Sequence, residues 1–277
     1  MSERFAFGKN WASFLGTLDE ARMLEAEQSL DEMVGRDRIR GATFVDVGSG
    51  SGLFSLAAMR LGARRVHSFD YDQDSVACTA ELRRRFFPEA ANWTVEQGSA
   101  LDAEYVGRLG GWDVVYSWGV LHHTGDMWRA IDLVTTLVGP SGRFFIAIYN
   151  DQGPWSRYWT AVKRFYNRGP LPRWIVQAVF MSYWAARGAA VDLLRGRRPW
   201  RRYAEYRAAR GMSVWHDWND WLGGYPFEVA SPEAIFDFFR ARQFTLTKLK
   251  TRGGTLGCNE LVFVRDTPRE PTPCRTS

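Results

Sequence analysis

A glycine-rich turn between an apolar strand and a helical run is the part of this chain best suited to chemistry. Residues 43–47 read TFVDV, and glycine then occupies every second position, at Gly48, Gly50 and Gly52. The run 53–61 that follows has the composition of a helix. In this arrangement bare backbone can lie against a ligand while the helix N-terminus points at it. The turn therefore indicates a nucleotide-like ligand at the carboxyl ends of parallel strands.

The spacing of the glycines and the acid before them narrow the choice of ligand. The dinucleotide fingerprint needs glycine at position 53, which is leucine. Asp46 would repel a pyrophosphate and suits a cationic or zwitterionic group instead. The pattern D-x-G-x-G-x-G resembles the first motif of the class I S-adenosylmethionine-dependent methyltransferases, whose cofactor carries a sulfonium and an ammonium group. The resemblance implies cofactor contacts at Asp46, Gly48, Ser49, Gly50 and Gly52.

Two further strand ends supply candidate contacts to the rest of this cofactor. Asp70 ends the strand 65–70, 22 residues after Gly48, where a carboxylate can bind both ribose hydroxyls, and Tyr71 follows it. A third strand, 92–97, leads into the turn that usually offers an acid to the adenine amino group in this family. Ser99 stands there instead. The adenine contact is therefore expected from the Ser99–Leu101 turn, through the backbone of Ala100, or from the carboxylate of Asp102; the candidates are Ser99, Ala100, Leu101 and Asp102.

The strand 112–117 and the loop WGVLHHTG after it resemble the fourth family motif. In the family this loop lies along the methionine end of the cofactor and faces the substrate. Trp118 is the expected cofactor contact, and His122 and His123 are the leading candidates for a general base, with His216 next. A base is needed only when the acceptor must lose its proton. A structural hydrogen-bonding role for these histidines is the alternative.

The order of elements predicts an α/β fold. Five strands alternate with helices over residues 41–150, the fifth being 143–149 after a turn at 139–142, which specifies a doubly wound parallel sheet. A helix that opens at Ser231 and an antiparallel pair, 244–249 and 260–264, complete a seven-stranded, mostly parallel, Rossmann-like methyltransferase sheet. The predicted organisation is an N-terminal helical segment (1–40), a cofactor-binding core (41–150), a helical cap (151–230), a completing unit (231–266) and a disordered tail (267–277).

The predicted cap, inserted after the fifth strand, is the part that distinguishes this chain. Eight of the thirteen tryptophans fall between positions 155 and 221, and 175–194 is a second helical run. Such lids exclude water and select the substrate, although packing of aromatics onto the core is the alternative for most of them. The loop 148–153 and a predicted lid-hinge loop, 216–228, supply the candidate substrate contacts. These are Tyr149, Asn150, Asp151, Asp217, Asp220 and Tyr225.

Seven arginines lie between positions 195 and 210, although the whole chain has a net charge of only +5. Three interpretations are open. The arginines form a solvated face, or they bind a phosphate or carboxylate of the substrate, or they bind an anionic membrane. The apolar run before them, 174–184, is too short for a transmembrane span. The modest net charge and the lack of a recognition motif argue against nucleic acid.

Composition and motifs together favour one cytoplasmic enzyme. The N-terminus shows no secretory apolar run, and the three cysteines have neither disulfide nor metal-ligand spacing, so no metal is expected. Stretches such as SWGVLHHTG and IYNDQG are similar to a bacterial small-molecule subgroup of the family. The predicted function is methyl transfer from S-adenosylmethionine to an O, N or S acceptor on a small anionic or amphiphilic metabolite. A nicotinamide-dependent oxidoreductase and a non-catalytic cofactor-binding module are the alternatives.

Overall fold

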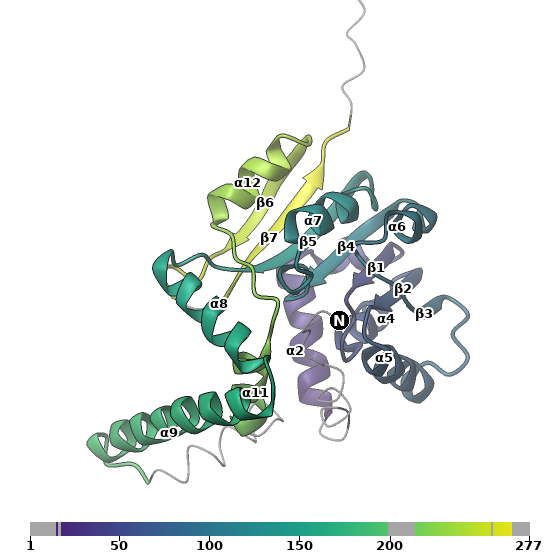
Figure 1. Cartoon of the computed structure of the whole chain (residues 1–277). Helices are drawn as coiled ribbons and strands as arrows, with labels where there is room; N and C mark the ends of the chain where they lie inside the picture. Colours follow the sequence, from purple (N-terminus) through teal and green to yellow (C-terminus); the bar gives the residue numbers. More distant parts are fainter. Residues whose placement is uncertain (1–14, 16–17, 199–213, 256, 268–277) are drawn as a thin grey trace, which may run out of the picture.

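A seven-stranded sheet lies at the centre of the computed structural model, which describes residues 15, 18–198, 214–255 and 257–267 (Figure 1). The strand order is β3-β2-β1-β4-β5-β7-β6, with β7 antiparallel to both of its neighbours. The strands are β1 (Thr43–Val47), β2 (Arg65–Asp70), β3 (Trp93–Gln97), β4 (Trp112–Trp118), β5 (Val138–Tyr149), β6 (Phe244–Lys250) and β7 (Cys258–Arg265). The predicted fold class is confirmed.

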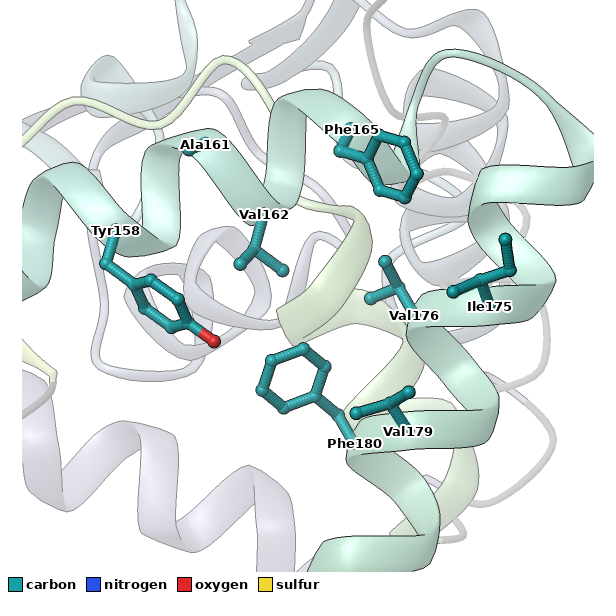
Figure 2. A pocket seen from close by; sticks show the side chains of 8 residues that line it. All are labelled: Tyr158, Ala161, Val162, Phe165, Ile175, Val176, Val179 and Phe180. Atoms are coloured by element: carbon teal, nitrogen blue, oxygen red, sulfur yellow. The ribbon is translucent and has the colours of Figure 1, made fainter.

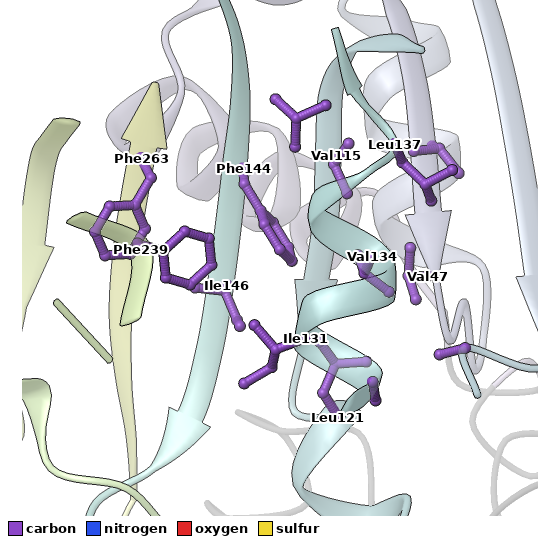
Figure 3. Close-up of a cluster of buried hydrophobic side chains, with 14 of the residues drawn as sticks. Val47, Val115, Leu121, Ile131, Val134, Leu137, Phe144, Ile146, Phe239 and Phe263 are labelled. Carbon is purple, nitrogen blue, oxygen red and sulfur yellow. The ribbon is translucent and has the colours of Figure 1, made fainter. Parts of the chain in front are cut away.

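Helices cover both faces of the sheet because successive strand residues point to opposite sides and both sides are apolar. On one face, Phe44 and Val114 pack with side chains of α2 (Glu20–Met33), α3 (Arg36–Ile39), α4 (Leu53–Arg60) and α5 (Gln73–Phe86). On the other face, Val115 and Phe144 pack with α6 (Ala103–Leu109), α7 (Met127–Thr135) and α12 (Pro232–Arg240). Figure 3 shows this second cluster, in which Phe239 of α12 stacks on Phe263 of β7.

The fifth strand differs from its prediction. The expected turn at 139–142 belongs to β5, which begins at Val138. Val138 pairs with Trp112, and the register shifts before Arg143 pairs with Val114. Ser141 has φ 57°, so the Gly-Pro-Ser-Gly segment is an irregularity inside one strand.

The described part of 151–230 contains three helices, α8 (Pro154–Tyr166), α9 (Pro170–Leu194) and α11 (Val214–Gly223). Earlier in the chain, a short 3-10 helix, η1 (Leu121–His123), follows β4. The predicted loop at 216–228 was wrong in its first half, because α11 continues to Gly223. Trp218 and Trp221 are spaced for one side of a helix and contact rings of α8 and α9, which explains why this polar-looking segment is helical. Four arginines of the predicted cluster, Arg201, Arg202, Arg207 and Arg210, lie outside the described residues.

Candidate functional site

The glycine turn joins β1 to α4 with a backbone that only glycine adopts readily, with φ of 77°, 53° and 81° at Gly48, Gly50 and Gly52. A Cβ at Gly48 would overlap the side chain of Val120, and one at Gly52 would lie 2.8 Å from Cα of Thr79. Packing within the protein therefore requires glycine at positions 48 and 52, two of the three glycines that were predicted to contact the cofactor. The Ser49 hydroxyl lies 3.0 Å from that of Thr79, so it faces α5.

Asp70 ties the glycine turn to the end of β2. Its Oδ2 accepts a hydrogen bond from the Gly50 amide at 3.0 Å, and its Oδ1 accepts one from the Asp72 amide at 2.8 Å. Burial raises the pKa of the Asp70 carboxyl, and these two amide donors oppose that rise. Tyr71, the next residue, is exposed, and its carbonyl accepts from Gln97 at the end of β3. This bond holds the carboxyl ends of β2 and β3 together.

Asp46 is buried at the end of β1 beneath the turn. Its Oδ2 accepts from the Ser55 hydroxyl at 2.5 Å, Ser55 lies 2.7 Å from the Ser68 hydroxyl, and Ser68 accepts from Trp93 Nε1 at 2.9 Å. Burial raises the pKa of Asp46 to about 7, with the nearby charge of Asp70 as a smaller contribution. Asp46 therefore changes its charge in the physiological pH range.

The turn after β3 is closed by its own polar groups. The Ser99 hydroxyl accepts from the Leu101 amide at 3.2 Å, and Oδ1 of Asp102 caps α6 by accepting from two backbone amides at 3.0 Å. Ala100 is almost fully buried. Because Ser99 and one oxygen of Asp102 are engaged locally, the backbone of this turn is the better candidate for the adenine contact.

Trp118 ends β4 with 40% of its surface exposed, and its Nε1 donates to Oε1 of Glu260 at 3.3 Å. Two residues earlier, the buried hydroxyl of Tyr116 has no hydrogen-bond partner among the described residues. Burial, Asp46 and Glu260 together raise the pKa of that hydroxyl. Glu260 was not among the predicted site residues, and the signal it offers in the sequence is an acid directly before the apolar run 261–264.

The histidine loop begins beside the glycine turn, since Val120 packs on Gly48. His122 is fully buried, and its Nδ1 accepts from the Tyr149 amide at 3.3 Å. That bond places the ring proton on Nε2, which has no hydrogen-bond partner among the described residues. Burial lowers the pKa of His122 well below its ordinary value, and the charges of His123 and Lys163 add to this. In this tautomer His122 is a neutral hydrogen-bond donor.

His123 has the opposite tautomer. Its Nδ1 lies 2.5 Å from the carbonyl oxygen of Pro226, which can only accept, so Nδ1 carries the proton and Nε2 the lone pair. Burial lowers the pKa of His123 to about 4, although the bond to Pro226 opposes that shift. Of the two histidines on this loop, only His123 has a tautomer that can accept a proton at Nε2.

Tyr149 lies at the centre of an aromatic cluster that joins the sheet to the predicted cap. Its ring centroid is 4.1 Å from that of His122, 5.1 Å from Phe227 and 5.6 Å from Trp221. Lys163 of α8 is buried in the same cluster, donates to the carbonyl of Trp221, and lies over the Trp221 ring at 4.1 Å.

Sequence reasoning also missed Lys163. The available signal was its position, since it shares one side of α8 with the buried or half-buried rings of Trp159 and Tyr166. A lysine on an apolar helix face requires a partner in the interior.

The remaining predicted substrate contacts have other hydrogen-bond partners where their side chains are described. Asn150 bonds to carbonyls of the 251–257 loop and accepts from Asn259 at 3.0 Å, and exposed Asp151 accepts from the Gly153 amide at 2.9 Å. The Tyr225 hydroxyl accepts from Arg164 at 3.1 Å. His216, Asp217 and Asp220 lie on α11, and their side chains are outside the described part of the structure.

Comparison with known proteins identifies the family. A family model described as "Methyltransferase domain" matches residues 18–245. The chain belongs to the methyltransferase domain family. The sequence-based recognition of a class I S-adenosylmethionine-dependent methyltransferase is thereby confirmed, and with it the cofactor.

The individual proteins that match this methyltransferase do so over a short stretch or at low sequence identity. The ribosomal protein L11 methyltransferase of Anoxybacillus flavithermus is 31% identical over 119 residues, which cover 37% of this chain and 36% of that protein. The chain thus spans little more than a third of that relative. The magnesium protoporphyrin IX methyltransferase of Synechocystis, solved with bound SAH, gives a TM-score of 0.52 at 13% identity, covering 88% of this chain and 83% of that one.

An O-methyltransferase family protein from Burkholderia thailandensis gives a TM-score of 0.53, also at 13% identity, and the match covers 88% of this chain and 56% of that one. At such low identity these two structures are similar to the methyltransferase in fold alone.

Proposed function

We propose that this methyltransferase methylates an O, N or S atom of a small anionic or amphiphilic metabolite bound beside Tyr149. The observation that carries the proposal is the contact between Gly48 and Val120, which places the start of the buried histidine loop against the glycine turn. The cofactor region and the Tyr149 cluster are therefore neighbours, as a donor and an acceptor of a methyl group must be.

Several residues fit the cofactor by their chemistry. The buried carboxylate of Asp46 suits its cationic end, Asp70 suits the ribose hydroxyls, and the backbone of the 99–101 turn suits adenine. Exposed Tyr71 and Trp118 offer rings at the rim. When bound, the cofactor supplies a methyl group made electrophilic by its attachment to a sulfonium.

The Tyr149 cluster suits the acceptor. An acceptor lone pair forms the new bond to the methyl carbon while the carbon–sulfur bond breaks, and positioning at near-attack distance can supply about 7–11 kcal/mol of the barrier reduction. His122 donates from Nε2 to an acceptor oxygen, and His123 takes a proton at Nε2 when the acceptor must lose one. The charge of Lys163, with the Trp221 and Phe227 rings, favours an anionic or amphiphilic acceptor.

Isotope transfer tests this proposal. The purified protein is incubated with methyl-labelled S-adenosylmethionine and either a metabolite extract or a protein extract, and the label is followed into each fraction. We expect label in the metabolite fraction, and calorimetry should show binding of S-adenosylmethionine and none of NADH. Binding without transfer to either extract would indicate a non-catalytic module.

A protein acceptor is the second candidate, because a curated relative methylates a ribosomal protein by its name. Label confined to the protein extract would favour this candidate and contradict the metabolite proposal.

A further inference from the structure

The segment Pro154–Arg198, called the arm below, has a charge unlike that of the rest of the chain. It comprises α8, α9 and the residues that follow α9, and it contains nine basic side chains and a single acidic one, Asp192. The rest of the chain has 27 basic and 30 acidic side chains. Asp192 is buried, as is Lys163, whereas the other eight basic side chains are exposed. All exposed charge on the arm is therefore positive.

The arm also exposes apolar side chains in rows. Within α9, which has 25 residues, only Val176 and Asp192 are buried. Leu171, Ile175 and Val179 are spaced four residues apart, and Leu193 lies five helical turns beyond Ile175, so all four share one side of the helix. Leu171 and Leu193 each keep about two thirds of their surface exposed, at 66% and 67%.

A groove of about 360 Å³ between α8 and α9 continues this apolar side (Figure 2). Tyr158 and Phe165 of α8 line it from one side and Ile175 and Val179 from the other, and the Tyr158 hydroxyl is its single polar side-chain group. We call six of the exposed apolar side chains on the two helices the arm surface: Trp155, Tyr158, Leu171, Ile175, Val179 and Leu193.

We propose that the arm surface binds the surface of an anionic lipid bilayer. Apolar and aromatic side chains beside arginines are the combination by which interfacial helices insert among headgroups, and each nearby basic residue is attracted to anionic lipid. In Figure 1, α8 and α9 extend away from the sheet. No helix in the described ranges is long and apolar enough to cross a membrane, so contact is at the surface.

A second copy of this chain is a poorer occupant of the same surface. Pairing two arms would bring sixteen exposed arginines together without an exposed acid on either arm to compensate them, and like charges across an interface oppose association. A bilayer that contains anionic lipid has the complementary charge.

Vesicle flotation tests the proposal without cofactor or acceptor, so its result is independent of the proposed function. We expect the protein to float with phosphatidylcholine vesicles that contain phosphatidylglycerol, to stay behind with phosphatidylcholine alone, and to be released by salt. Replacing Arg195, Arg197 and Arg198 by Gln should weaken binding by roughly tenfold or more, since each basic residue contributes several-fold.

The matched control replaces three exposed arginines at α3 by Gln, with the same change in net charge: Arg36 and Arg38 within the helix and Arg40, its C-cap. It should keep most of the binding. Failure of the wild-type protein to bind anionic vesicles at low salt, or equal losses in the two triple variants, would overturn the proposal.

A second pair of variants tests the apolar contribution. Leu171→Ser with Leu193→Ser should reduce flotation several-fold, whereas Leu24→Ser with Leu249→Ser, at exposed positions outside the arm, should not. Both doubles should melt close to the wild-type temperature. A clearly larger loss of melting temperature in the arm double would show that the fold itself covers these leucines. A doubled mass in sedimentation that the arm double abolishes would show a second copy on the arm surface, and either result would contradict bilayer binding.

Discussion

The Ser55 hydroxyl donates to Asp46 at 2.5 Å, and this bond ends a chain of buried hydrogen bonds that starts at the Trp93 indole. Ser68 is the remaining link, so the chain connects β3, β2, α4 and β1 beneath the glycine turn. The carboxyl that should face the cationic end of the cofactor is thus held in place from the far edge of the sheet. Burial raises the pKa of this carboxyl to about 7, because an apolar interior disfavours its charged form.

Asp46→Asn should therefore stabilise the protein without cofactor at pH 8. The pKa of Asp46 is raised from 3.8 to about 7 in the folded state, so the folded state binds the extra proton between these values and stability falls as the pH rises. The side-chain amide of the Asp46→Asn variant cannot ionise, so the variant should not lose stability in this way as the pH rises. The melting temperature of Asp46→Asn relative to wild type should rise between pH 5 and pH 8. The exposed control Asp237→Asn should show no such trend, and a difference that is constant with pH would contradict the assignment.

Asp70→Ala should weaken S-adenosylmethionine binding by roughly tenfold to a hundredfold, because charge-assisted hydrogen bonds contribute about 1.5–3 kcal/mol. The loss has two sources, the ribose contact that we propose and the bond from the Gly50 amide that holds the turn. Asp70→Asn keeps a carbonyl acceptor for the Gly50 amide but loses the negative charge. Comparing the two variants therefore separates the turn-holding bond from the ribose contact. Calorimetric titration of both variants measures the effect, and an unchanged dissociation constant in folded Asp70→Ala would refute the ribose role.

Gly48→Ala should destabilise the protein itself, because its Cβ would overlap Val120 and its φ of 77° is strained for alanine. Val120→Ala in the same chain removes the two nearest atoms, at 2.2 and 2.6 Å, but leaves the Val120 Cβ contact at 2.9 Å and the backbone strain. The double variant should therefore melt above Gly48→Ala, and the interaction energy of the cycle should be favourable by about 1 kcal/mol or more. Simple additivity of the two single variants would show that the contact between the turn and the histidine loop is loose.

Local patterns carried the prediction of the fold. The strands were recognisable as short apolar or alternating runs between turn residues, and Ser231 caps α12 through the Ala234 amide, as its place before Pro232 indicated. The misses have local causes as well. Gly139 to Gly142 read as a turn because glycine and proline usually end strands, and here the strand tolerates them as an irregularity. The polar residues of α11 concealed the tryptophan spacing that makes it helical.

The candidate site was predictable only where its residues lie at or after strand ends. Asp46 and Asp70 lie in the last residues of β1 and β2, and His122 follows β4, and parallel strands bring these ends to one edge. Lys163 reaches Trp221 across 58 positions of the chain, and no periodicity indicates such a contact. The roles of His122 and His123 could not be predicted from the sequence either. They depend on which ring nitrogen forms the hydrogen bond to the Tyr149 amide or to the Pro226 carbonyl.

The pH dependence of methyl transfer should identify the base. A base must be unprotonated, so activity that depends on His123 should be full well above its pKa of about 4 and should fall as the pH drops through that value. An unperturbed histidine would place this fall near 6.5. Initial rates between pH 4 and 8 with saturating cofactor measure the profile. A midpoint near 6.5 would contradict the assignment of His123.

Substitution of the two histidines separates the base from the donor. If the acceptor must lose a proton, His123→Gln should lower kcat by roughly 10²–10⁴-fold and leave the cofactor dissociation constant unchanged. His122→Gln keeps an N–H donor, so its main effect should be on KM for the acceptor. Equal, small losses in both variants would mean that the acceptor arrives already deprotonated, as a carboxylate does. His123 would then act by holding Pro226, and the charge of Lys163 would be the main guide for the acceptor.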